Sequence, residues 1–305
     1  MIRTKKRGLA SLYLIAIILL SLLVIGATGC ESLQGSGLGS FFSQTASGTY
    51  GVDFILDSGI GNIVQGKKVP LGDDFYVKLN AYNYDKEQKS VKICVKDNID
   101  ETFGGIKTGG DCQDKVLPAA DVTLTGTGTK TSEKISPSIT PFIFGSYTYH
   151  DIPLDIQEAK LFISAIYRES PRITANLQIP TPETETLTLI QSPAIIKTSI
   201  IKTVNLKDES YKANLAITFS KQKQAVKITS PDFTLENKTK LTISASPLQV
   251  ECKNLENGFF EIKNEKLISC SALASKEENT YPLILQLDYG VRDERTYSFT
   301  IKAEQ

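Results

Sequence analysis

Five cysteines and one histidine are the residues of this 305-residue chain whose types could support redox, metal or nucleophilic chemistry. His150 precedes Asp151, and such a pair could form a general base with its orienting carboxylate. Adjacent side chains of an extended segment point to opposite faces, so the pairing is geometrically poor. No nucleophile-elbow, phosphate-loop or metal-ligand motif accompanies the histidine. We therefore expect a surface histidine in a protein that has no enzymatic activity and no cofactor.

Four of the cysteines fall into two pairs with equal separations of 18 residues, Cys94 with Cys112 and Cys252 with Cys270. Four cysteines permit three connectivities, and the equal separations favour two local disulfides. An even number of cysteines suits an oxidising exterior. A zinc site is the alternative, but the C-x2-C spacing of zinc ribbons is absent. The sequence therefore predicts two disulfides and no metal.

The fifth cysteine, Cys30, ends an apolar segment. Residues 9–29 carry no charge and follow a short basic stretch, residues 1–7. A signal-peptide core usually has about 7–15 apolar residues and a membrane-spanning helix about 20, so the length favours an uncleaved helix. The small residues of Ala27-Thr28-Gly29 directly before Cys30 resemble the lipobox of prokaryotic membrane lipoproteins. The resemblance implies that Cys30 is the lipidated first residue of the mature chain.

A third interpretation treats residues 5–8 (Lys-Lys-Arg-Gly) as a pilin-like processing site, which would leave the apolar helix on the mature protein. All three interpretations keep the positive charge in the cytoplasm and place the rest of the chain outside. Residues 31–49 are rich in Gly and Ser and are predicted to be a flexible tether. We expect a membrane-anchored protein whose body faces the exterior.

Composition supports a folded, exported body. The 34 basic and 34 acidic residues give no net charge, which argues against a nucleic-acid partner. Beyond the tether, period-two alternation rich in Val, Ile, Thr, Tyr and Phe is broken roughly every 8–12 residues by turn-forming residues. This pattern predicts an all-β protein, and it resembles immunoglobulin-like sandwiches in architecture.

The body also contains an internal repeat. Residues 76–93 align with 211–228 at an offset of 135, and residues 161–179 align with 283–301 at an offset of 122. Repeated blocks in the same order indicate tandem units. The Pro- and Thr-rich residues 181–185 form a stiff connector. We predict two sandwiches, over residues 50–180 and 186–305, joined at that connector.

Several surface features could bind a partner. Asp97, Asp100 and Glu101 could supply oxygen ligands to calcium, although turn chemistry also explains them. Asn237 begins an Asn-Lys-Thr glycosylation pattern. The aromatic residues 142–149 could contact a partner, with a buried sheet face as the alternative. The lysine-rich turns at residues 85–89 and 221–224 are predicted to be solvated hairpin tips. The aromatic candidates are Phe142, Phe144, Tyr147 and Tyr149.

These features together suggest a non-catalytic binding, adhesion or structural role at the cell envelope, with another envelope or surface protein as the partner. A ligand-binding lipoprotein that serves a membrane transporter is one alternative. A subunit of a surface filament is another, in which residues 31–48 donate a strand to a neighbouring copy. Because sandwiches host many functions, the fold alone does not choose among them.

Overall fold

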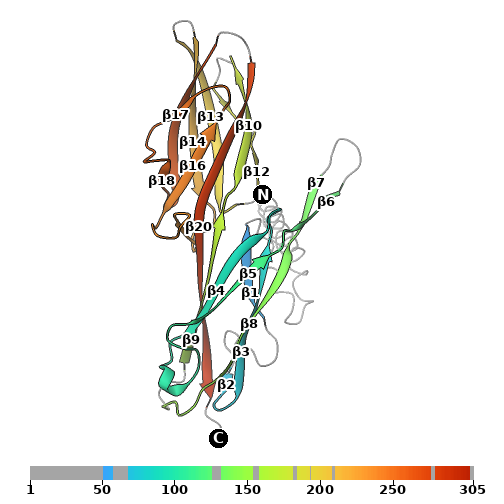
Figure 1. Ribbon diagram of the computed structural model, residues 1–305, viewed down its shortest axis with the longest axis vertical. Helices are drawn as coiled ribbons and strands as arrows, with labels where there is room; N and C mark the ends of the chain where they lie inside the picture. Colours follow the sequence, from blue (N-terminus) through green and yellow to red (C-terminus); the bar gives the residue numbers. More distant parts are fainter. Residues whose placement is uncertain are drawn as a thin grey trace, which may run out of the picture. The chain divides into compact units, whose positions relative to one another are not determined.

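The computed structural model describes residues 51–57, 68–125, 132–153, 158–180, 184–192, 194–207, 210–275 and 279–302. Thr49–Gln305 form one compact unit, shown in Figure 1. The structure is 70% strand and 1% helix, with several antiparallel sheets, so the predicted all-β sandwich fold is confirmed. The predicted anchor, Cys30 and the tether lie outside the described residues.

Twenty strands and one short 3-10 helix, η1 (Glu101–Phe103), make up the described secondary structure. The strands are β1 (Val52–Leu56), β2 (Lys68–Pro70), β3 (Asp74–Asn83), β4 (Lys89–Asp97), β5 (Asp111–Leu117), β6 (Asp121–Thr125), β7 (Ser132–Ser136), β8 (Ser138–Thr148), β9 (Glu158–Glu169), β10 (Arg172–Ile179), β11 (Glu185–Thr186), β12 (Ile190–Gln191), β13 (Ile196–Lys207), β14 (Ser210–Lys221), β15 (Lys227–Thr229), β16 (Lys238–Ser244), β17 (Val250–Cys252), β18 (Phe259–Glu261), β19 (Glu265–Ala274) and β20 (Asn279–Lys302).

The alternation in the sequence explains why these segments are strands. In β9 every second side chain, from Ala159 to Glu169, is buried, and the side chains between them are exposed or half-buried. The same period appears in β3 and β14. Side chains of a strand point alternately to its two faces, so each of these strands packs one face against a core.

The strands form three larger sheets and one hairpin. A three-stranded sheet has the order β1-β3-β8, and a five-stranded sheet has the order β11-β13-β14-β19-β17. A ten-stranded sheet contains the path β12-β10-β20-β9-β4-β5, and β2, β15 and β16 also pair with β20. Strands β6 and β7 pair only with each other among the described strands.

The ten-stranded sheet packs against both smaller sheets. Tyr167 of β9 donates its hydroxyl to the carbonyl of Val52 in β1, over 3.2 Å. In the other half, the rings of Phe219 in β14 and Phe260 in β18 stack with centroids 4.9 Å apart. The three-stranded sheet therefore faces the β9 end of the large sheet, and the five-stranded sheet faces its β18 end.

One long two-stranded ribbon connects these two ends. Strand β20 has 24 residues. Its C-terminal half pairs with β9, from Tyr289 opposite Glu169 to Thr300 opposite Glu158. Its N-terminal half pairs with β10, from Gln286 opposite Arg172 to Asn279 opposite Ile179. The register is the same on both sides of Ser170 and Pro171, so β9 and β10 form one interrupted strand along β20 (Figure 1).

The ribbon exchanges strands between the two ends of the sheet. The chain leaves β9, which faces the three-stranded sheet, and continues directly into β10, beside the five-stranded sheet. On the return, the first half of β20 lies beside β10 and β16, and its second half completes the sheet around β9 and β4. The β18 end therefore contains β10, which continues from β9, and the β9 end contains the second half of β20, which continues from the first half.

The second repeated pair of segments is the ribbon itself, because residues 161–179 are in β9 and β10 and residues 283–301 are in β20. The first repeat also has corresponding strands in the two halves. Strands β3 and β14 lie in the two smaller sheets, and β4 and β15 each pair with a strand of the ribbon, β9 and β20 respectively. The second neighbour of the interrupted strand changes at residues 170–171, from β4 beside β9 to β12 beside β10. The connector at residues 181–185 and the number of domains stay predictions.

Candidate functional site

The structure corrects the hypothesis that the aromatic residues 142–149 form a binding surface. Phe142, Phe144 and Tyr149 are fully buried, so they cannot contact a partner, and Tyr147 is half-buried. Tyr149 stacks on Phe75 with ring centroids 4.7 Å apart. Alternation in β8 turns both phenylalanines inward, so the buried sheet face, the alternative interpretation, describes this segment.

The calcium candidates are engaged in turn structure. Asp97 accepts hydrogen bonds from the Tyr149 hydroxyl at 2.6 Å and from the Ile106 and Ile99 amides. Burial raises the pKa of Asp97 against these three bonds. Asp100 caps η1 through Thr102 and Glu101 accepts from Thr108. Within the described ranges, no three His, Cys, Asp or Glu side chains gather as ligands for a metal ion.

Two other predicted residues have ordinary surroundings. His150 is exposed, and its ring lies beside Gly104. Asn237 is half-buried in the turn before β16 with a φ of 58°, and Thr239 of its glycosylation pattern is fully buried. Modification of Asn237 stays a prediction.

Both predicted disulfides are present, Cys94–Cys112 and Cys252–Cys270. In each bridge the two cysteines lie directly opposite each other on neighbouring antiparallel strands. The first bridge holds β5 to β4 at the edge of the ten-stranded sheet, and the second holds β17 to β19 at the edge of the five-stranded sheet. The equal spacing in the sequence therefore does not reflect equivalent positions in the fold.

Polar groups fasten the ribbon at the point where β9 passes into β10. The Arg168 guanidinium donates to both carboxylate oxygens of Asp288, and Ser170 Oγ donates to the same carboxylate over 3.1 Å. Gln286 Nε2 donates to the Ser170 carbonyl. Pro171 has no N–H, but its carbonyl still accepts the Leu287 amide at 3.1 Å, so the ladder continues through the break.

A second polar cluster connects three elements. Arg295 of β20 donates to the carboxylates of Asp53 in β1 and of Asp293, the latter over 2.9 Å. Its guanidinium also lies 3.9 Å from the ring centroid of Phe54. Lys223, in the turn after β14, donates to Asp293 over 2.6 Å. Residues of the three-stranded sheet, the ribbon and the turn beyond the five-stranded sheet thus share one set of charges.

The third cluster is buried beside the end of β9. Lys89 Nζ lies 2.8 Å from Asp85 Oδ2 and 3.1 Å from Glu169 Oε2. The exposed fractions of these residues are 7% for Lys89, 6% for Asp85 and 0% for Glu169. Lys86, Glu87 and Gln88 at the predicted solvated tip are exposed, but Asp85 and Lys89 at its two ends are buried. Lys89 is buried beside an opposite charge that Glu169 supplies from a strand distant in the sequence.

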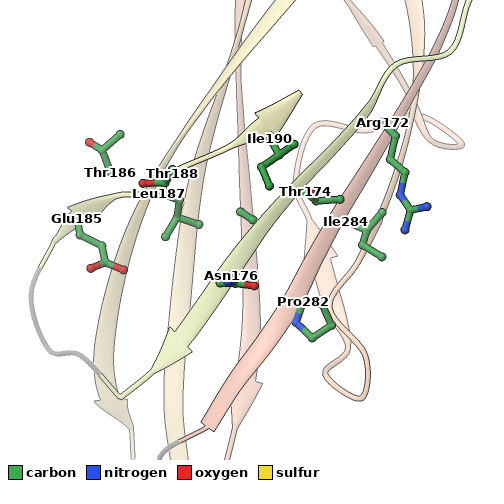
Figure 2. A pocket seen from close by; sticks show the side chains of 11 residues that line it. Arg172, Thr174, Asn176, Glu185, Thr186, Leu187, Thr188, Ile190, Pro282 and Ile284 are labelled. Atoms are coloured by element: carbon green, nitrogen blue, oxygen red, sulfur yellow. The ribbon is translucent and has the colours of Figure 1, made fainter. Parts of the chain in front are cut away.

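A shallow groove of about 490 Å³ lies on the outer face of β10 and the first half of β20. Figure 2 shows Thr174 and Asn176 on one strand and Ile284 and Pro282 on the other. The segment of residues 185–190 passes along its border, as it leaves the five-stranded sheet for the ten-stranded one. Ile190 there is 76% exposed, so the groove combines apolar and polar walls.

No protein-family model and no curated protein matches the chain. Among solved structures, the chain is similar to the crystal structure of red sea bream transglutaminase, at 10% identity and a TM-score of 0.19. The alignment covers 90% of this chain and 34% of that one, so this chain spans about a third of that protein's length. A TM-score this low carries no argument about fold or activity. The comparison assigns no enzymatic activity to this chain.

In the part of the chain that the structure describes, no helix has the length and apolar character needed to cross a membrane.

Proposed function

We propose that this protein is a membrane-anchored structural component of the cell surface, displayed outside the cytoplasm through Cys30 or the apolar helix before it. Its role is non-catalytic: it holds or spaces other envelope or surface proteins. The observation that carries this proposal is the shared ribbon. A continuous ladder from residue 158 to 179 along β20 supports both ends of the ten-stranded sheet.

The positions of the disulfides and of the polar clusters support a structural role. The two disulfides hold edge strands to their neighbours, and edge strands are the elements that most readily separate or pair with other chains. The Asp288 and Arg295 clusters hold the ribbon between these edges. Disulfides persist in oxidising surroundings, which favours an exterior location.

Cell fractionation with surface proteolysis tests the anchoring. Full-length protein in intact cells should remain with the membrane and be cut by added protease. A Cys30→Ser variant should leave the membrane fraction if a lipid holds the chain, and should stay if the uncleaved helix does. A chain protected from protease in intact cells would contradict the proposal.

Cross-linking of intact cells followed by mass spectrometry then tests the role. Links to envelope or surface proteins would support the structural proposal. Links chiefly between copies would favour the filament subunit, and deleting residues 31–48 should then abolish assembly while leaving the fold intact.

The groove supports the alternative of a ligand-binding lipoprotein that serves a membrane transporter. Apolar Ile190 and Ile284 line it together with the cationic side chain of Arg172. Links to a membrane transporter, together with weaker ligand capture by an Ile190→Asp variant, would favour this alternative over the structural role.

A further inference from the structure

The buried cluster of Lys89, Asp85 and Glu169 brings an amine and two carboxyl groups into contact where water is excluded. The Lys89 nitrogen touches one oxygen of each carboxyl group, at 2.8 Å and 3.1 Å. The other oxygen of Glu169, Oε1, is buried and has no hydrogen-bond partner. A charge-paired site normally satisfies both carboxylate oxygens, so an ion pair alone does not account for this arrangement.

We propose that Lys89 and Glu169 become joined by an intramolecular amide bond. The Lys89 nitrogen attacks the side-chain carboxyl carbon of Glu169 and a C–N bond forms. The C–O bond to one oxygen of that carboxyl group breaks, and the oxygen leaves as water with two protons from the reacting groups. An ammonium and a carboxylate are thereby converted into an amide and one water molecule, so no oxidant, reductant or cofactor is needed.

The surroundings favour a proton on the carboxyl group that is attacked. Burial lowers the pKa of Lys89, but the charges and hydrogen bonds of Glu169 and Asp85 outweigh burial and raise it, so the nitrogen has to give up a proton before it attacks. Burial raises the pKa of Glu169 to about 7, although the charge and hydrogen bond of Lys89 oppose this change. The raised pKa favours the neutral acid of Glu169, which is the form that an amine can attack. Asp85 contacts the same nitrogen and can take its proton, then return that proton to the departing oxygen.

The reacting groups are held in place by local structure. Asn83 is fully buried and donates to the carbonyls of Glu87 and Pro118, at 2.8 Å and 2.7 Å. Its side-chain oxygen accepts the Asp85 amide at 2.9 Å, which fixes the turn that carries both Asp85 and Lys89. Holding reactants in contact converts their encounter into a unimolecular step.

The position of the bond gives it a structural purpose. Lys89 begins β4 and Glu169 ends β9, directly before the break at Ser170 and Pro171. The two residues are 80 positions apart in the sequence. The amide would tie the chain covalently at the joint of the ribbon, where the disulfides do not reach.

A second buried lysine provides a matched control. Lys202 is fully buried, and its nitrogen lies 2.5 Å from Glu185 Oε1, but the Glu185 side chain is 44% exposed. Water reaches that carboxyl group, whereas the Glu169 side chain is fully buried. We therefore expect the Lys202 side chain to form no amide bond.

Mass spectrometry of the purified, reduced full-length protein tests the bond. We expect a branched proteolytic peptide that joins Lys89 to Glu169 and has lost one water, and no tryptic cleavage after Lys89. The Lys202→Arg variant should give the same peptide. The Lys89→Arg and Asp85→Asn variants should lack it while keeping the circular dichroism spectrum of a folded β-protein.

The wild-type peptides decide the matter even if the variants fail to fold. Unmodified linear peptides that contain Lys89 and Glu169 would overturn the proposal. A branch from Lys89 to Asp85 would overturn the assignment of Glu169 as the acceptor, and formation of the full bond in Asp85→Asn would overturn the role of Asp85.

Discussion

At the scale of single residues, Gly51 shows how closely the chain fits around the buried cluster. A Cβ atom at this position would lie 1.9 Å from Glu169 Oε1, far inside van der Waals contact. We expect Gly51→Ala to reduce the free energy of unfolding by about 1–3 kcal/mol, the usual effect of overpacking. Urea denaturation measures it. Gly109→Ala is the control, because a Cβ there meets nothing within 4 Å, and equal effects in both variants would contradict the explanation.

The ion pairs of Asp293 should make the free energy of unfolding decrease at acid pH. Burial raises its pKa, but the hydrogen bonds and charges of Arg295 and Lys223 outweigh burial and bring the pKa below 3.8. The unfolded chain therefore takes up this proton first as the pH falls, so this contribution is complete above about pH 4 and is lost at lower pH.

The measurement is urea denaturation between about pH 5 and about pH 3. Wild type should lose more stability over this interval than Asp293→Asn, which lacks the titrating group. Asp114→Asn, at an exposed position on β5, should follow wild type. Parallel losses in wild type and Asp293→Asn would show that other groups dominate the acid response.

At the scale of elements, each disulfide should stabilise the chain by closing a loop. With a separation of 18 residues, the chain-entropy relation gives about 3 kcal/mol for each bridge. Replacing both cysteines of one bridge by serine should lower the free energy of unfolding by roughly that amount, measured in urea without reductant. The two double variants should show similar losses, since the loops have equal length. An unchanged midpoint would contradict the prediction.

The same scale shows what the sequence can predict. Alternation identified the body as all-β, because period-two burial is a local property of the chain. The two disulfides followed from cysteine spacing. The burial of Lys89 was missed because charged residues in a turn are usually solvated, and only the partner Glu169, 80 positions away, reverses that expectation. The partners of β10 were also missed, since pairing across the fold leaves no local signal.

At the scale of the whole molecule, the strand exchange predicts that residues 50–180 do not fold alone. This fragment lacks the second half of β20, which pairs with β9 over twelve positions from Glu158 to Glu169. Without it, β9 would expose a long unpaired edge. Circular dichroism and amide exchange should show a fragment without protected structure.

Adding a synthetic peptide of residues 287–302 should restore protection in β9, while a peptide of the same composition in scrambled order should not. A stable fold of residues 50–180 without the peptide would instead support two independent domains divided at residues 181–185.

The exchange also determines when the protein can mature. In the layer that faces the three-stranded sheet, β9 pairs with residues 289–300, which follow it at a great distance in the sequence. A ribosome delivers β9 well before this partner, so the first half of the body stays open until the second half of β20 has emerged. Pairings this distant in sequence form slowly. Under the exterior location that we propose, this delay would keep the chain in the extended form that an export channel accepts.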